Sequence, residues 1–150
     1  MRERIRRYRE ADREALADVW LRSVKATHEF LSEDDIAVLL PLVRREAWND
    51  METWILESAD RKMAGFMCLF EGKMEGLFIA PEFLRQGLGR RLADRAKRKW
   101  ETLYVDVNEQ NKGACAFYKA CGFTPFGRSE TDSQGMPFPL IHMRYKRTRA

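Results

Sequence analysis

The feature that most constrains this chain is an unbroken succession of strand, glycine turn, helix and strand. The segments "MEGLFIA" (residues 74–80) and "TLYVDVN" (residues 102–108) have the composition of strands, and residues 87–100 repeat apolar side chains with helical spacing. A helix that connects two neighbouring strands makes them parallel, with a right-handed crossover. The glycine turn therefore lies where a strand ends and a helix begins.

The rest of the chain supplies further strands and helices on both sides of this unit. Strands are predicted at residues 2–8, 52–58, 63–71, 123–130 and 138–145, and helices from Asp12, from Ser32 and over residues 111–121. We expect the first strand to lie at an edge of the sheet, and Pro41 to kink or split the second helix. The predicted fold is α/β, a mixed central sheet of six to seven strands flanked by about four helices, in one domain over residues 1–150.

The composition excludes several classes of protein. With 150 residues and 45% hydrophobic content, the chain can bury a core without disulfides or a metal. Its cysteines, Cys68, Cys115 and Cys121, form no C-x-x-C pair and have no histidine at zinc-ligand spacing, so we expect reduced thiols, no metal site and a cytoplasmic location. The charged N-terminus and the lack of a long apolar run argue against secretion and membrane insertion.

The glycines Gly87 and Gly89 allow the turn to bind an anion. Backbone N–H groups at a helix N-terminus favour negative charge, and Arg85, Arg90 and Arg91 add positive charge. The alternative is that the glycines only relieve crowding where the helix begins. The spacing does not fit a dinucleotide-binding fingerprint, because "PEFLRQ" separates the strand from the glycines, and a Walker loop is absent. The remaining interpretation is a site for the pyrophosphate of another cofactor.

Two motifs at the expected separation resemble those of the GNAT superfamily of acyl-CoA-dependent N-acetyltransferases. The first, "LFIAPEFLRQGLGRRL", is similar to a strand followed by [QR]-x-x-G-x-[GA], and the second, "NKGACAFYKACGF", is similar to N-x-x-A-x-x-x-Y-x-x-x-G-F. The resemblance covers nearly the whole chain and extends to a bacterial subgroup of small, mostly uncharacterised members. It implies the acyl-CoA N-acyltransferase fold, acetyl-CoA (coenzyme A) as acetyl donor, and no metal.

The resemblance also assigns the residues that bind the coenzyme. It implies that backbone groups at the strand end hold the pantetheine arm and polarise the thioester, and that the glycine turn binds the pyrophosphate. The matching positions are Phe78, Ile79, Ala80, Arg85, Gln86, Gly87, Leu88, Gly89, Arg90 and Asn111. Leu84 stands where the family has Gln or Arg. Because the binding groups are mostly backbone N–H groups, we expect binding to persist.

Transfer of an acetyl group to an amine needs an acid for the departing thiolate and a base for the attacking amine. The resemblance places Tyr118 at the general-acid position near the coenzyme sulfur, whereas from the residues alone it is a core aromatic. Glu75, Asp106 and His28 are the candidate bases, acting directly or through water. The alternatives are solvated strand residues for the two carboxylates and a structural role for His28, as for His142.

The function predicted is transfer of acetyl from acetyl-CoA to a primary amine, by direct attack in a ternary complex. The first alternative is a non-enzymatic acyl-CoA sensor on the same fold. A nucleic-acid-binding module is a third hypothesis, but Asp94 and an apolar stripe interrupt the basic residues of the helix after the glycine turn. We expect a small-molecule or peptide amine as acceptor, and no membrane or nucleic-acid partner. The sequence leaves the identity of the acceptor and the oligomeric state open.

Overall fold

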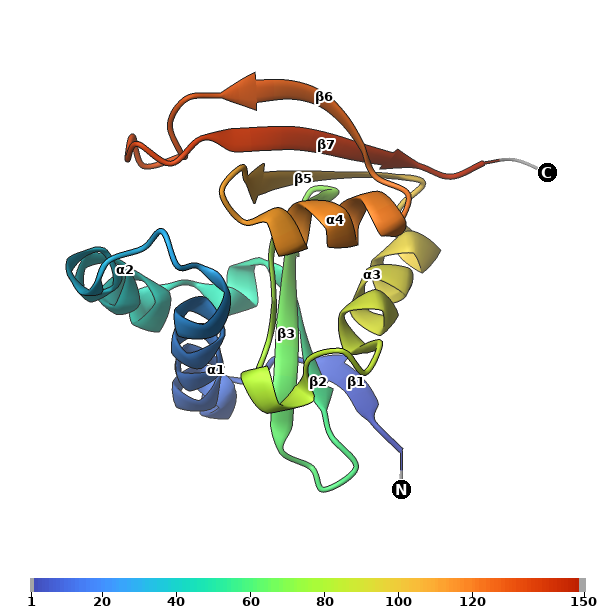
Figure 1. The fold of residues 1–150 in the computed structure, drawn as a ribbon. Helices are drawn as coiled ribbons and strands as arrows, with labels where there is room; N and C mark the ends of the chain where they lie inside the picture. Colours follow the sequence, from blue (N-terminus) through green and yellow to red (C-terminus); the bar gives the residue numbers. More distant parts are fainter. Residues whose placement is uncertain (1, 149–150) are drawn as a thin grey trace.

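Seven strands form one mixed sheet, which confirms the α/β fold predicted from the sequence (Figure 1). The computed structural model describes residues 2–148. The strands are β1 (Arg4–Arg7), β2 (Glu52–Glu57), β3 (Met63–Phe70), β4 (Lys73–Ile79), β5 (Thr102–Asn108), β6 (Thr124–Ser129) and β7 (Leu140–Lys146). The helices are α1 (Arg13–Thr27), α2 (Glu33–Arg45), α3 (Leu88–Lys99) and α4 (Lys112–Ala120), with short 3₁₀ helices at Glu10–Asp12, Trp48–Asp50 and Pro81–Phe83. Strands and helices follow one another in the predicted order.

The sheet is antiparallel except at one place, where β4 and β5 run parallel. The strand order β1-β2-β3-β4-β5-β7-β6 puts β1 at an edge, as predicted. Helix α3 connects β4 to β5, which confirms the parallel pair expected from the strand, turn, helix and strand succession. The glycine turn consequently lies at the carboxyl end of a central strand, where α/β sheets bind ligands.

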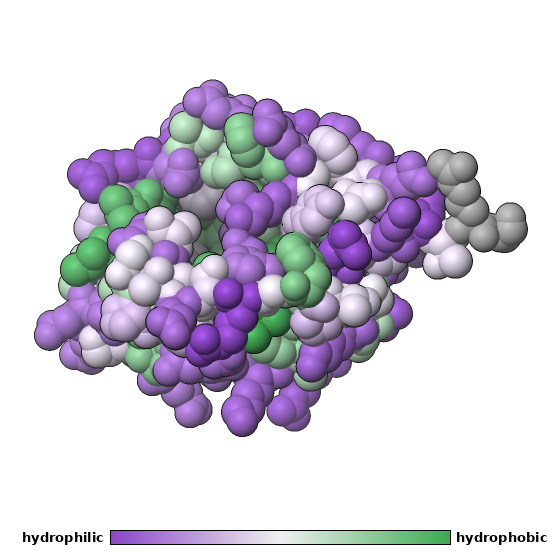
Figure 2. Space-filling view, turned by 90° about the horizontal axis from the view of Figure 1, so that it is seen from above, coloured by the Kyte–Doolittle hydropathy of each residue, from purple (hydrophilic) through white to green (hydrophobic). Residues whose placement is uncertain are grey.

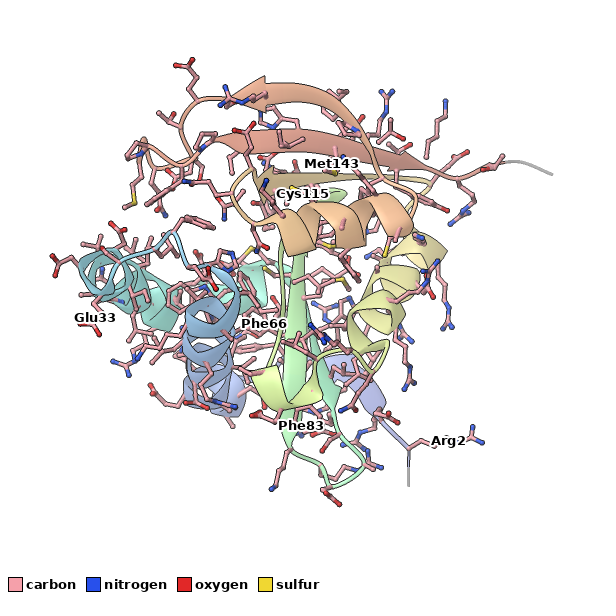
Figure 3. The ribbon with its side chains drawn as sticks, in the orientation of Figure 1. Arg2, Glu33, Phe66, Phe83, Cys115 and Met143 are labelled. Carbon is pink, nitrogen blue, oxygen red and sulfur yellow. The ribbon has the colours of Figure 1, made fainter. Side chains whose placement is uncertain are left out.

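Helices cover both faces of the sheet, and each face has its own apolar core (Figure 1). Helices α1 and α2 pack on one face, around Leu16, Val19 and Phe66. Helices α3 and α4 pack on the other face, around Leu92 and Met143. Figure 3 shows Phe66 between α1 and the central strands, and Met143 on β7 beside α4. Because burial of apolar surface is the main favourable term in folding, these two cores hold β4 and β5 firmly in the middle of the molecule.

Helix α2 begins as its sequence predicts but does not break where expected. Ser32 and Asp35 form a capping box, in which each side chain accepts the backbone N–H of the other at 3.0 Å. Of the two predicted effects of Pro41, a kink or a split, the split does not occur, because the helix continues through Pro41 from Glu33 to Arg45. Proline removes one backbone donor, but the apolar side chains of α2, including Leu40, pack into the core beside α1 and keep the helix in place.

The face of the molecule that carries β6 and β7 is dominated by polar side chains (Figure 2). On this face, hydrophobic residues lie in separate groups (Figure 2). None of the helices within residues 2–148 has the length and apolar composition needed to cross a bilayer. Cys68 and Cys121 are buried, Cys115 is half-buried, and all three are free thiols.

Candidate functional site

A cleft opens where β4 and β5 separate. The two strands pair only through Lys73 with Tyr104 and Met74 with Val105, after which they diverge. At the same point β4 has a β-bulge, in which Glu75 has no partner on β3. The cleft has a volume of about 1000 Å³, and it is lined by the end of α1, β4, the glycine turn, β5 and α4. The splayed pair therefore leaves one edge of β4 accessible to a ligand.

The end of β4 presents backbone groups to this cleft. Phe78 and Ile79 line it, whereas the N–H of Ala80 donates to the carbonyl of Ala64 at 2.8 Å. Because N–H groups along a strand point alternately to its two edges, the N–H of Ile79 points away from β3 and toward the gap. Of the three backbone positions expected to face the thioester, Ile79 offers its N–H, and Ala80 does not because its N–H is already bonded.

The glycine turn leads into α3 with N–H groups that have no helical partner. Gly87 is the N-cap, with a φ of 76°, and its carbonyl accepts the N–H of Arg91 at 3.2 Å. The N–H groups of Leu88, Gly89 and Arg90 precede the first helical hydrogen bond. Among the described residues, no side chain caps this end, and the first turn holds no acidic residue. With the helix dipole, these groups form a site that suits a phosphate.

Side chains around the turn differ in what they offer to the cleft. Arg85, Arg90 and Leu84 line it. Gln86 is outside the lining within residues 2–148, and its Nε2 donates to the carbonyl of Glu82 at 3.4 Å. The two arginines can therefore place positive charge beside the N–H groups of α3. Leu84, which is 40% exposed, contributes apolar surface only.

Tyr118 lies on α4 in the wall of the cleft. Its side chain is buried, and its hydroxyl donates to Sδ of Met74 at 3.7 Å, a weak acceptor. Burial raises the pKa of Tyr118 well above its ordinary value, so the phenol keeps its proton at neutral pH. A hydroxyl without a strong acceptor can donate its proton to a group that arrives in the cleft.

A chain of hydrogen bonds joins the end of α1 to the start of α4. Asn111 caps α4: its Oδ1 accepts the N–H of Ala114 at 3.0 Å, so its Nδ2 is the group that faces Nε2 of His28 at 3.3 Å. Nδ1 of His28 lies 2.8 Å from the hydroxyl of Thr27, which itself donates to the carbonyl of Ser23. His28 is therefore neutral, with its hydrogen on Nδ1. Burial lowers the pKa of His28, in agreement with this assignment.

The three candidate bases have different environments. Glu75 and His28 line the cleft, whereas Asp106 is outside the lining within the part of the chain that the structure describes. Oδ1 of Asp106 lies 2.5 Å from Nδ1 of His142, and Oδ2 lies 2.7 Å from Nζ of Lys73. Burial acts to raise the pKa of Asp106, but the hydrogen bonds from Lys73 and His142 outweigh it, and the pKa is lowered. With both oxygens engaged, Asp106 is a poor proton acceptor, whereas Glu75 is exposed, with Lys73 at 4.0 Å.

Sequence reasoning missed Phe30, an aromatic residue that lines the cleft, and Phe138, whose ring packs against it. Ring centroids are 5.4 Å apart for His28 and Phe30, 5.5 Å for Phe30 and Phe138, and 6.4 Å for His28 and Phe78. Phe30 follows His28 closely in the sequence, but its contact with Phe138 joins distant segments that no local pattern connects. A smaller cavity of about 230 Å³ adjoins the cleft, and His28 and Phe78 line both.

Most basic residues of α3 have partners inside the protein. The pairs are Arg91 with Glu3, Arg95 over the ring of Trp54, Lys97 with Asp94, and Lys99 with Glu52. The three carboxylates among these partners reduce the positive charge that the helix offers to an external polyanion, which disfavours the nucleic-acid hypothesis. Arg90 instead lines the cleft, where it can meet an anionic ligand.

Comparisons with known proteins identify relatives of this chain. The family model described as "Acetyltransferase (GNAT) family" matches residues 14–123. "Peptidyl-lysine N-acetyltransferase YjaB" of Escherichia coli (strain K12) is 40% identical over 141 residues, which are 94% of this chain and 95% of the relative. The solution structure of apo YjaB from Escherichia coli is similar with a TM-score of 0.89 at 40% identity, covering 99% of this chain and 100% of that chain. The crystal structure of the PaiA N-acetyltransferase from Thermoplasma acidophilum in complex with coenzyme A shares the fold, with a TM-score of 0.77 at 22% identity, covering 97% of this chain and 99% of that chain.

Proposed function

Because the chain belongs to the GNAT family and is an N-acetyltransferase, we propose that it transfers the acetyl group of acetyl-CoA to the side-chain amine of lysine in a protein or peptide. The amine attacks the thioester directly while both substrates are bound. One observation carries this proposal: a single cleft between β4 and β5 contains the start of α3, the end of β4 and Tyr118. An anion site, a carbonyl-polarising donor and an acid therefore share one cavity.

The residues of the cleft fit a pyrophosphate followed by an extended arm. The N–H groups of Leu88, Gly89 and Arg90, with the guanidinium of Arg85, suit the phosphate oxygens. The edge of β4 that faces the gap can hydrogen-bond the amides of the pantetheine arm, as a missing strand would. The N–H of Ile79 points into the same gap, where it can stabilise the negative charge that develops on the thioester oxygen.

Tyr118 serves as the acid for the leaving thiolate. Its hydroxyl lies in the cleft wall with only the thioether of Met74 as acceptor, so its proton is available. The burial that raises the pKa of the phenol also raises that of a thiol beside it, because both charged forms are anions. The proton can then pass from the phenol to the thiolate as the carbon–sulfur bond breaks.

Glu75 serves as the base for the amine, directly or through one water. Its carboxylate lines the cleft at the bulge where the two central strands part, and it also attracts a lysine ammonium to this position. His28 acts as a positioning residue, because its Nε2 already accepts a hydrogen bond from Asn111. Asp106 belongs to a different cluster, in which it contacts His142 on β7.

Two observations support a lysine side chain as the acceptor: the name of a relative and the residues that line the cleft. YjaB, 40% identical, is named a peptidyl-lysine N-acetyltransferase. The rings of Phe30 and Phe78 offer apolar surface to the methylene stem of a lysine, while Glu75 suits its ammonium. A lysine ammonium has a pKa of about 10.4, higher than that of an α-amine, so this acceptor has the greater need of a base.

The proposal is tested by measuring thiol release from acetyl-CoA with three acceptors. These are a peptide whose only amine is a lysine side chain, a peptide whose only amine is its N-terminus, and a polyamine. We expect the lysine peptide to react fastest, with the product at Nε identified by mass spectrometry. Preference for another amine would overturn the lysine assignment. Tight binding of acetyl-CoA without transfer to any amine would favour the acyl-CoA sensor.

A further inference from the structure

Strands β5, β7 and β6, which are neighbours in the sheet, carry a row of hydrogen-bonded side chains that the acetyl-transfer site does not use. Asp106 on β5 and His142 on β7 are direct cross-strand neighbours, and Nδ1 of His142 lies 2.5 Å from Oδ1 of Asp106. Ser129, the last residue of β6, places its Oγ 2.6 Å from Nε2 of the same ring. Among the described residues that line the two cavities, none belongs to this row.

The hydrogen positions in this row follow from the chemistry of its members. An ionised carboxylate only accepts, so the hydrogen of the neutral imidazole lies on Nδ1 and points to Asp106. Nε2 then carries the lone pair, and the hydroxyl of Ser129 is its donor. The ammonium of Lys73, 2.7 Å from Oδ2 of Asp106, keeps the carboxylate ionised and in place.

We propose that Ser129 is a nucleophilic hydroxyl that takes acyl groups from small activated esters, with His142 as its base and Asp106 as the residue that orients the imidazole. A carboxylate, an imidazole and a serine hydroxyl in this order are the arrangement that activates serine for attack on a carbonyl. The side chain of His142 is 26% exposed and Ser129 is half-buried, so a small ester can reach them.

The reaction balances within these groups and the ester. Oγ of Ser129 attacks the carbonyl carbon of the ester, and its hydrogen passes to Nε2 of His142. The new Oγ–carbon bond forms as the bond to the leaving alkoxide or phenoxide breaks, and the leaving group takes the proton from Nε2. The product is an acyl-serine on an outer strand, separate from the acetyl-CoA cleft.

The test uses the full chain and two probes that report serine acylation. A fluorophosphonate forms an Oγ–phosphorus bond with loss of fluoride, and p-nitrophenyl acetate leaves an acetyl group and releases p-nitrophenol. We expect both to modify Ser129, as located by peptide mapping. Ser129→Ala should abolish this labelling, and Asp106→Asn or His142→Gln should slow it about 10²-fold. Ser133→Ala, at an exposed serine in the loop between β6 and β7, should leave it unchanged.

Acetyl transfer from acetyl-CoA supplies the second readout. Ser129→Ala should retain this activity, which shows that the variant is folded, and Tyr118→Phe should still be labelled by the fluorophosphonate. Labelling of Ser133 or Cys115 instead of Ser129 would overturn the proposal, as would equal labelling of wild type and His142→Gln. If the wild-type protein showed no acetyl transfer but Ser129 were labelled, the proposed function would be contradicted and the proposal for Ser129 would stand.

Discussion

The two sides of the cleft are built from different parts of the chain. On the α3 side, the groups available to a ligand are mainly backbone N–H groups at the helix N-terminus, with Arg85 and Arg90 beside them. Elsewhere in the lining they are individual side chains, among them Glu75, His28 and Tyr118. Backbone groups need only the correct local conformation, so the α3 side tolerates a departure such as Leu84. In the rest of the lining, the chemistry depends on the identity of each side chain. Substitutions should therefore have large effects on the chemistry there and smaller effects on coenzyme binding.

The largest effect is expected for Tyr118→Phe, which removes the acid and leaves the apolar contacts of the ring. The rate of acetyl transfer should fall about 10²-fold to 10⁴-fold, because general acid catalysis contributes that much. Acetyl-CoA binding, measured by calorimetry, should change little. Tyr104→Phe is the matched control, since Tyr104 is 40% exposed on β5 and lies outside the lining. Equal activity in Tyr118→Phe and wild type would remove Tyr118 from the mechanism.

Next in size is the effect of Glu75→Gln, which removes the proposed base at constant volume. Transfer to the lysine peptide should slow about 10²-fold at neutral pH. Asp106→Asn should cause a smaller loss, because this carboxylate is bound by Lys73 and His142 and does not line the cleft. Steady-state rates of both variants decide between the two residues. A greater loss of transfer rate in Asp106→Asn than in Glu75→Gln would indicate that Asp106 is the base.

The fold was predictable because its elements have strong local patterns. The strand, glycine turn, helix and strand succession sets the parallel pair of β4 and β5, and Ser32 marks the start of α2. The errors came from tertiary contacts. Pro41 does not split α2, because its apolar side chains pack into the core. Asp12 precedes α1 as expected, but its carboxylate accepts hydrogen bonds from Arg6 at 2.8 and 2.9 Å and does not cap the helix.

The sequence named side chains that line the cleft, such as Tyr118 and Glu75, but only at the glycine turn did it also predict the local conformation. The turn before α3 requires a positive φ at Gly87, a conformation that favours glycine, so this turn can be recognised in the sequence. Contacts between side chains that are distant in the sequence leave no such local pattern. That Asn111 meets His28, or that His142 engages Asp106, depends on how distant strands and helices pack. That Glu75 lines the cleft and Asp106 does not therefore became visible only in the structure.

A moderate effect is expected on the backbone side from Gly87→Ala. A side chain at a φ of 76° costs about 1 to 2 kcal/mol, so the turn either strains or rearranges its N–H groups. Acetyl-CoA affinity should fall about tenfold by calorimetry. Gly135→Ala is the matched control, because Gly135 also has a positive φ, of 77°, with open space around its Cβ position, in the loop between β6 and β7. It should lower stability similarly and leave affinity unchanged. Equal affinities of both variants would contradict a coenzyme site at this turn.

The smallest effect concerns stability, through His28. Burial lowers its pKa in the folded state below the ordinary value of 6.5, so the unfolded chain binds the extra proton more readily. The contribution of neutral His28 is fully present above that value and is lost as pH falls below it. Protonation would also place a hydrogen on Nε2, facing the Nδ2 donor of Asn111, whose Oδ1 is held by Ala114. The hydrogen bond between His28 and Asn111, which joins the end of α1 to the start of α4, should then break.

Urea unfolding of wild type and His28→Gln at about pH 7.5 and about pH 5.5 measures this contribution. Gln can keep an acceptor for Asn111 but cannot be protonated, so the free energy of unfolding should fall less with decreasing pH in the variant than in wild type. An equal fall in both proteins would mean that His28 contributes nothing to the pH dependence. An imidazole pKa at or above the ordinary value, measured by NMR titration of the folded protein, would contradict a neutral His28 in the lining of the cleft.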